Sequence, residues 1–172
     1  MFISRLVLAS SALAFAAPFA PSFTAPLAAA SVQPQVDPLR FFQGRTETIG
    51  TVKVIFHKPY RTHSIGAGRI EPDGSLTLVQ RVDDEGKAPH DRRWRVRQTA
   101  PDQFTATMSD AIGPVTIDRV GDRYRFRFRL QGNLSAEQML TPLPGGREAL
   151  SNIKVKRMGF TVATTDGIVR KI

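Results

Sequence analysis

Apolar and polar residues alternate with a period of two along most of the chain. The alternation is clearest in residues 115–130, VTIDRVGDRYRFRFRL, where one face of each strand is apolar and the other is charged. Turn-forming residues interrupt the pattern about every 8–12 positions, which is typical of an antiparallel sandwich or barrel. Besides the two hairpins treated next, the pattern predicts strands near residues 48–57, 63–71, 75–83, 136–143, 150–160 and 160–171.

The first hairpin is predicted to turn at Gly121-Asp122, because a two-residue Gly-Asp loop is a favoured hairpin connection. This turn places apolar side chains opposite apolar ones and polar side chains opposite arginines. The predicted pairs are Ile117 with Phe126, Val115 with Phe128, Asp118 with Arg125, and Thr116 with Arg127. A slip of one residue would move every side chain to the other face, so the agreement of the two patterns fixes the register.

A second hairpin is predicted between residues 92–98 and 102–108, with Pro101 in the turn. A three-residue loop would place Val96 opposite Phe104 and Trp94 opposite Ala106.

A short helix is predicted before the first strand. Asp37 is a capping residue, Pro38 suits the first helical position, and Gly44 limits the helix to one or two turns. With nine or ten consecutive strands and short connections, an up-and-down barrel is the expected closure, because a barrel leaves no unpaired edge. The predicted fold is therefore an all-β, up-and-down antiparallel barrel of about 8–10 strands with a short N-terminal helix, spanning residues 38–172.

The first 30 residues have the order of an export signal. Arg5 precedes an apolar run, LVLASSALAFAA, which is followed by prolines and a small-residue ending, LAAA. The run is shorter than the roughly 20 residues that a spanning helix needs. Ala28 and Ala30 predict cleavage before Ser31, with residues 31–37 as a short tether; an uncleaved anchor is the alternative. The expected location is the periplasm or the exterior, at the periphery of the envelope.

The charge and the lack of cysteine narrow the chemistry. The chain of 172 residues has no cysteine and a net charge of +9, which becomes +8 without Arg5. Disulfides, thiolate metal sites and cysteine nucleophiles are therefore excluded. A positive field of this size favours association with anionic partners, such as a membrane surface.

The two faces of the arginine-rich strands suggest two candidate sites. The apolar face would point into the barrel, where it would either fill the core or contact a small apolar ligand. Its members are Trp94, Val96, Phe104, Met108, Ile117, Tyr124, Phe126 and Phe128. The basic face would be either a solvated exterior or a contact with an anionic surface. Its members are Arg93, Arg95, Arg97, Arg125, Arg127 and Arg129.

The order of several motifs resembles a bacterial envelope family catalogued as domain of unknown function 3833. The motifs are FFQGRTETIG, DDEG before RRWRVRQ, SDAIGPV, and KRMGFTVATTDGIVRK, and the resemblance covers about residues 39–172. It implies a lipocalin-like fold and an envelope location. Many relatives resemble lipoproteins with a lipidated cysteine, which this chain lacks. Where relatives tend to have an Asp-Trp pair, this chain reads QGNLSAEQML, so a role for that pair does not transfer.

No catalytic or cofactor motif is present. His57, His63 and His90 lack the spacing of a zinc site, and Glu47 and Asp91 do not complete one. There is no G-x-S-x-G elbow. Nucleic-acid platforms place aromatic and basic residues on one exposed face, whereas here they alternate between two faces. We therefore expect no metal, no cofactor and no nucleic acid, and the oligomeric state is open.

Four functions remain open from the sequence. The favoured one is an exported barrel that binds or carries a small apolar or amphipathic ligand near an anionic membrane. A barrel with a solid core could instead be a structural or interaction module without a ligand. A small outer-membrane barrel would turn its aromatic face to lipid and its arginines inward. Lipocalin-like barrels also host enzymes, although no residue here indicates a reaction.

Overall fold

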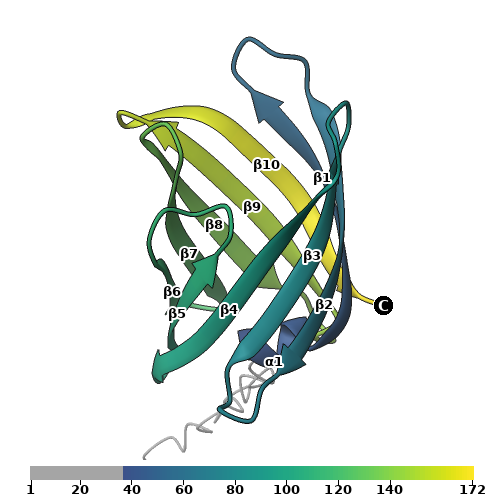
Figure 1. Ribbon diagram of the computed structural model, residues 1–172, viewed down its shortest axis with the longest axis vertical. Helices are drawn as coiled ribbons and strands as arrows, with labels where there is room; N and C mark the ends of the chain where they lie inside the picture. The colour runs from purple at the N-terminus through teal and green to yellow at the C-terminus, as the bar shows by residue number, and fades with distance from the viewer. Residues whose placement is uncertain (1–36) are drawn as a thin grey trace, which may run out of the picture. The chain divides into compact units, whose positions relative to one another are not determined.

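A computed structural model describes residues 37–172, which form ten antiparallel strands and one short helix (Figure 1). The predicted signal segment 1–30 and tether residues 31–36 lie outside the described residues. Helix α1 is Pro38–Phe42. The strands are β1 (Gly44–Val54), β2 (Tyr60–Ile70), β3 (Leu76–Asp84), β4 (His90–Ala100), β5 (Gln103–Met108), β6 (Val115–Val120), β7 (Arg123–Leu130), β8 (Leu134–Pro142), β9 (Glu148–Arg157) and β10 (Phe160–Lys171).

Each strand pairs with its neighbours in sequence, and β1 pairs with β10 to close the barrel. The closing ladder runs from Thr46 opposite Lys171 to Val54 opposite Ala163. The predicted all-β up-and-down barrel is therefore confirmed, with ten strands. A closed barrel of this kind has no free edge at which another chain could add a strand.

The β6–β7 hairpin has the predicted register. Ile117 lies opposite Phe126, and Asp118 lies opposite Arg125. Gly121 supplies the positive φ of the turn, at 65°. The alternation of two strands was therefore sufficient to place their side chains.

The predicted register of the β4–β5 hairpin was wrong by two residues. Val96 lies opposite Ala106 rather than Phe104, and Trp94 lies opposite Met108 rather than Ala106. The ladder shifts between Gln98 and Ala100, and Asp102 has a φ of 57°, so the turn is tighter than a three-residue loop. Because the error is an even number of residues, the inward and outward faces are as predicted.

Helix α1 begins as its sequence predicts and closes one end of the barrel. The Asp37 carboxylate accepts a hydrogen bond from the backbone N–H of Leu39 at 2.8 Å, and Pro38 occupies the first turn. Leu39 and Phe41 are buried in the core. The helix lies close against β2, since a Cβ at Gly68 would overlap the carbonyl oxygen of Phe42. Glycine is therefore required where the helix meets the barrel wall.

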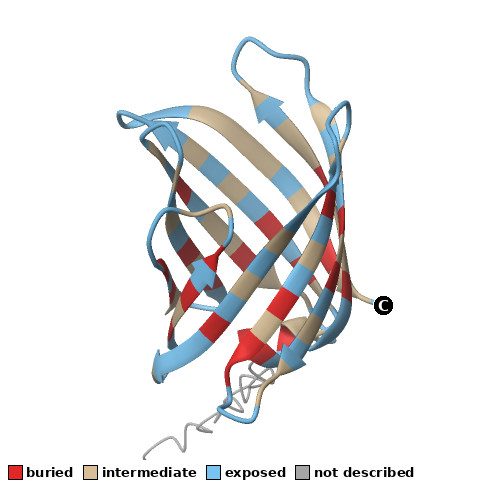
Figure 2. Ribbon diagram, in the orientation of Figure 1, coloured by how far each residue is buried: buried red, intermediate tan, exposed pale blue. Residues whose placement is uncertain are grey.

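The core and the open end occupy opposite ends of the barrel. Buried residues gather toward α1, while the loops at the far end are exposed (Figure 2). Strands β5 and β6 have only six residues each, compared with eleven in β1 and twelve in β10. The wall is therefore lowest at the β5–β6 loop (Figure 1). Helix α1 is far too short to cross a bilayer, and residues 37–172 contain no other helix.

Candidate functional site: the barrel cavity

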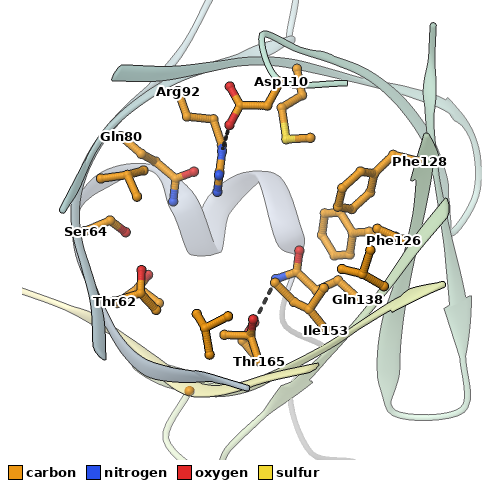
Figure 3. Close-up of a pocket in the computed structure, with 18 of the residues that line it drawn as sticks. Thr62, Ser64, Gln80, Arg92, Asp110, Phe126, Phe128, Gln138, Ile153 and Thr165 are labelled. Carbon is orange, nitrogen blue, oxygen red and sulfur yellow. Dashed lines mark hydrogen bonds and ion pairs between the residues drawn. The ribbon is translucent and has the colours of Figure 1, made fainter. Parts of the chain in front are cut away.

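The barrel encloses a cavity of about 660 Å³ between its open end and helix α1. Residues from every strand except β6 line it, and Phe42 of α1 contributes to its floor. Figure 3 shows these side chains pointing inward from around the barrel, with α1 behind them. The lumen is therefore not filled by side chains, which contradicts the alternative of a solid core.

One side of the cavity is aromatic. Trp94 of β4 contacts two rings of β7 edge-on, with centroid distances of 6.4 Å to Phe126 and 6.5 Å to Phe128. Leu76 and Val96 extend the apolar surface and are themselves buried. Edge-to-face ring pairs of this kind are favourable and orient the aromatic side chains. This apolar side offers a preformed surface for the hydrophobic part of a ligand.

The opposite side is lined by small side chains, which explains why the lumen is hollow. Strands β1, β2, β9 and β10 direct threonine, serine, alanine and glycine inward among valines and Ile153, whereas β4 and β7 contribute aromatic rings. The small residues are Thr48, Thr62, Ser64, Ser151, Ala163, Thr165 and Gly167. Gly50 lies opposite Gly167 in the β1–β10 ladder. A Cβ on Gly167 would lie 2.7 Å from the carbonyl oxygen of Ile49, so the backbones approach too closely for a side chain.

Two glutamines hold fixed positions in the lining. The side-chain oxygen of Gln80 accepts a hydrogen bond from Nε1 of Trp94 at 2.8 Å. The amide of Gln138 donates to the hydroxyl of Ser151 at 2.8 Å. Both hydrogen bonds satisfy polar groups that would otherwise lose water on entering the lumen. They also hold the Trp94 ring and the Gln138 side chain in one orientation.

An ion pair faces the cavity nearer its open end (Figure 3). Nε of Arg92 donates to Oδ2 of Asp110 at 2.6 Å, and both side chains are partly buried. Burial alone would raise the pKa of Asp110. The Ser109 hydroxyl, the Arg92 guanidinium and the charge of nearby His90 outweigh burial and hold that pKa below its ordinary value. Asp110 is therefore an anion, and Arg92 is anchored at the level where the cavity opens.

A second polar group lies at the mouth, on the β2 and β3–β4 side. Nζ of Lys87 donates to the Tyr60 hydroxyl at 2.7 Å and to Oδ2 of Asp84 at 3.3 Å. The Tyr60 hydrogen bond raises the pKa of Lys87, against the smaller opposing effect of burial. All three residues line the cavity. The cavity is therefore apolar at its floor and polar and charged at its entrance.

Five of the eight predicted inward residues line the cavity, and three lie deeper. Those in the lining are Trp94, Val96, Met108, Phe126 and Phe128. Phe104, Ile117 and Tyr124 are buried in the core instead. The Phe104 and Tyr124 rings meet edge-on at 6.2 Å. These three residues close the helix end of the barrel and do not line the main cavity.

The sequence prediction missed the polar half of the site. Arg92 shares a strand face with Trp94 and Val96, so alternation alone places it inward. It was overlooked because arginine was assigned to the exterior. Alternation also places Gln80 on the face of Leu78 and Val82, and Gln138 on the face of Ala136 and Leu140, so both glutamines could have been assigned to the lumen.

The exterior arginines do not form one surface. Strands β5 and β6 separate β4 from β7. Asp118 binds Arg125 at 2.6 Å and Arg127 at 3.2 Å. Arg95 lies 2.9 Å from Asp73, and Arg93 lies 3.7 Å from Asp91. Arg97 and Arg129 have no ion pair within residues 37–172.

Two of the three histidines lie beside carboxylates, and His90 also lines the cavity. His63 lies 3.0 Å from Glu47, and His90 lies 3.6 Å from Asp110. No group of three or more His, Asp or Glu residues in the described part of the chain is arranged to hold a metal ion.

Comparison with solved structures identifies the fold. The S-type phycobiliprotein lyase CPES of Guillardia theta superposes with a TM-score of 0.59 and 7% identity, covering 78% of this chain and 90% of that chain. Rv2717c from M. tuberculosis superposes with a TM-score of 0.54 and 14% identity, covering 81% and 98% of the two chains. At such low identity the likeness shows a shared lipocalin-like barrel and nothing about activity.

Comparison at the sequence level identifies the family. No curated protein matches the chain significantly. A family described as protein of unknown function (DUF3833) matches over residues 21–142, which ends before β9 and therefore before the closing motif KRMGFTVATTDGIVRK. The matched region covers most of the chain and confirms the resemblance that the earlier motifs indicated. This lipocalin-like barrel is a member of the DUF3833 family.

Proposed function

We propose that this protein binds a small amphipathic molecule in its barrel and carries or retains it in the cell envelope. The observation that supports this most directly is the hollow lumen of about 660 Å³, aromatic on one side and lined by small residues on the other. Ligand pockets in proteins have volumes of roughly 300–1,000 Å³ and combine apolar walls with a few fixed polar groups. The cavity has both properties.

The distribution of polarity indicates how such a ligand would lie. An apolar body would enter from the open end and pack against Trp94, Phe126 and Phe128. A polar end would stay at the mouth, near the Arg92–Asp110 pair and the Lys87 ammonium group. Burying a polar group without a partner is costly, so the reverse orientation is disfavoured.

The orientation of the two strand faces argues against an integral outer-membrane barrel. Such a barrel would direct its aromatic residues outward to lipid and its charged residues into the lumen. Here Phe126 is buried inside the barrel, while Arg127 is exposed on the exterior.

Export is the second part of the proposal. The first 30 residues have the composition of a cleaved signal, and the expected mature chain begins at Ser31 in the periplasm or outside the cell. Its net charge of +8 would attract it to anionic headgroups. N-terminal sequencing of the protein recovered from a periplasmic fraction tests this directly: a start at Ser31 supports it, and an intact Met1 in the cytoplasm contradicts it.

The ligand itself can be sought without knowing its identity. The protein from residue 31 onward, purified without detergent, is analysed by native mass spectrometry and by organic extraction. We expect a complex with one small molecule per chain that is lost on extraction. Recovery of the chain only in its unliganded mass, together with failure to bind an amphipathic probe, would contradict the proposal.

A further inference from the structure

The open end of the barrel carries an unusual concentration of exposed apolar side chains. Of nine large hydrophobic residues exposed within residues 37–172, five lie at this end: Ile112 on the β5–β6 loop, and four on the β1–β2 loop and at the β9–β10 turn. We name these four the apolar rim: Ile55, Phe56, Met158 and Phe160. Phe56 is 100% exposed, Met158 is 87% exposed and Phe160 is 76% exposed.

The two segments of the apolar rim are connected through the β1–β10 ladder. Val54 of β1 is opposite Ala163 of β10, and the next backbone N–H, that of Ile55, donates to the carbonyl of Val162 at 3.0 Å. The β1–β2 loop and the β9–β10 turn therefore project together beyond the wall. Figures 1 and 2 show both at the open end, with exposed tips. The apolar rim therefore lies at the ends of adjoining strands on one side of the mouth.

Two rim residues hold backbone conformations that their side chains disfavour. Phe56 has a φ of 62°, and Met158 has a φ of 50° and precedes Gly159 at 86°. Two successive positive φ values form the hairpin turn that prefers Asn-Gly. A bulky residue in the left-handed region is uncommon, whereas asparagine tolerates it well. Local folding therefore does not explain why the tips carry phenylalanine and methionine.

The residues around the apolar rim are basic. Residues 52–61 and 153–165 contain six Lys or Arg and no Asp or Glu. Lys58, Lys156 and Arg157 have no ion pair within residues 37–172. The neighbouring β3–β4 hairpin carries acidic residues, Asp83, Asp84 and Glu85, and Asp84 is paired with Lys87. The apolar and positive side of the mouth therefore lies over β9, β10 and β1, and the negative residues lie beside it on the β3–β4 side.

We infer that the apolar rim inserts into the surface of an anionic phospholipid bilayer, so that the barrel docks obliquely with its mouth beside the lipid. Exposed phenylalanine side chains flanked by unpaired lysine and arginine suit the boundary between headgroups and acyl chains. The acidic residues of the neighbouring β3–β4 hairpin would be repelled, so the barrel would tilt toward its β9–β10 side. This docking deepens the proposed function, because it would bring an amphipathic ligand to the entrance of the cavity.

Vesicle flotation of residues 31–172 tests the docking without any ligand. This length is suitable because the barrel closes and its core forms within residues 37–172, and it removes the apolar run of residues 6–17, which could bind lipid by itself. We expect binding to vesicles of phosphatidylcholine with 30% phosphatidylglycerol, weakening at high salt, and little binding to pure phosphatidylcholine. Equal binding to both vesicles, or none to either, overturns the inference.

Two matched variants distinguish the effect of the apolar rim from the effect of exposed apolar side chains in general. Phe56→Asn/Met158→Asn/Phe160→Ser should lower the partition coefficient about tenfold or more through loss of buried apolar area. Its melting temperature should be unchanged or higher, because asparagine suits the two left-handed positions. Val79→Thr/Val120→Thr/Leu150→Thr removes three exposed apolar side chains elsewhere and should bind as the parent does. Equal binding by both variants overturns the inference.

A site-specific probe reports the orientation and detects a competing occupant. The chain has no cysteine, so Phe56→Cys and Val120→Cys can each carry one environment-sensitive dye. We expect a blue shift with anionic vesicles only at position 56. A concentration-dependent shift without vesicles, together with a dimeric mass in light scattering, would identify the rim as an interface between two copies and overturn the inference.

Failure of docking and failure of ligand binding can be told apart. A variant with a blocked lumen, Thr165→Phe, should float with anionic vesicles as the parent does. The rim variant should still bind an amphipathic probe in free solution. Loss of vesicle binding by Thr165→Phe would show that the lumen, and not the rim, is the membrane contact.

Discussion

Arg92 and Asp110 face each other inside the barrel, with 2.6 Å between Nε and Oδ2. Arg92 lies on the same face of β4 as Trp94, and Asp110 lies in the loop that follows β5. A charged pair in this position costs desolvation, which is recovered only while both partners are present. The pair therefore lies where the apolar interior of the cavity meets its solvated mouth.

Breaking this pair should destabilise the barrel moderately. Arg92→Met leaves Asp110 partly buried without its cation, and Asp110→Asn leaves the guanidinium without its anion. Because both side chains retain some solvent, we expect each single variant to lose about 1–2 kcal/mol of unfolding free energy. Urea denaturation of both single variants and the double variant should give a coupling energy of about 1 kcal/mol. Additive losses would show that the two residues act independently.

Acid should lower the folding stability of the barrel through protonation of Asp73 in the β2–β3 turn. The Ser75 hydroxyl and backbone N–H, together with Arg95, lower the pKa of Asp73 from its ordinary value of 3.8 to about 2. Between these values the unfolded chain binds a proton that the folded chain does not, so stability falls as the pH drops from about 4 to 2. Melting temperatures of Asp73→Asn should fall less steeply across this window. The exposed Asp122→Asn variant should keep the parent slope, and equal slopes for all three proteins would contradict the prediction.

The packing of helix α1 against the barrel wall should depend on the glycine at position 68. A side chain there meets the Phe42 carbonyl oxygen, so Gly68→Ala must displace helix α1 or the wall of β2. Overpacking of this kind typically costs about 1–3 kcal/mol. The neighbouring Ala67 is exposed, and Ala67→Val should change stability little. Urea midpoints compare the two variants, and similar midpoints would mean that the helix does not rest on Gly68.

The exterior arginines should contribute less to vesicle binding than Lys58 and Lys156, the lysines next to the apolar rim. Arg125 and Arg127 share Asp118, so their charge is already partly balanced. Arg125→Gln/Arg127→Gln should therefore reduce flotation with anionic vesicles by less than Lys58→Gln/Lys156→Gln, although both variants remove two charges. The opposite order would assign the membrane contact to the barrel wall.

The predictable part of the fold is the part governed by period-two alternation. In β7, aromatic or apolar residues and arginines alternate without exception, and in β6 the pattern holds from Val115 to Asp118, so the register of Ile117 with Phe126 followed directly. At the β4–β5 turn, a ladder irregularity and the left-handed Asp102 altered the pairing, and neither is visible in an alternating pattern.

The cavity was harder to predict because it depends on the absence of large side chains opposite the aromatic rings. The sequence showed Trp94, Phe126 and Phe128 facing inward, but a core and a cavity wall have the same pattern. The space exists because distant strands place Thr48, Ser64 and Thr165 opposite those rings. Only the closed sheet brings these strands across from β4 and β7. The apolar rim was missed for a similar reason, since Phe56 and Met158 are far apart in sequence and come to the same side of the mouth only when β1 pairs with β10.

The measurement that tests the central claim most directly uses Trp94, the only tryptophan in the chain and a residue of the cavity lining. Excitation of Trp94 should transfer energy to dansyl-undecanoic acid bound in the lumen, with saturation at one probe per chain. Thr165→Phe, which fills the cavity, should weaken binding at least about tenfold, while Thr164→Phe on the adjacent outward position should not. Transfer that is absent in the parent, or equal in both variants, would contradict a ligand site in the barrel.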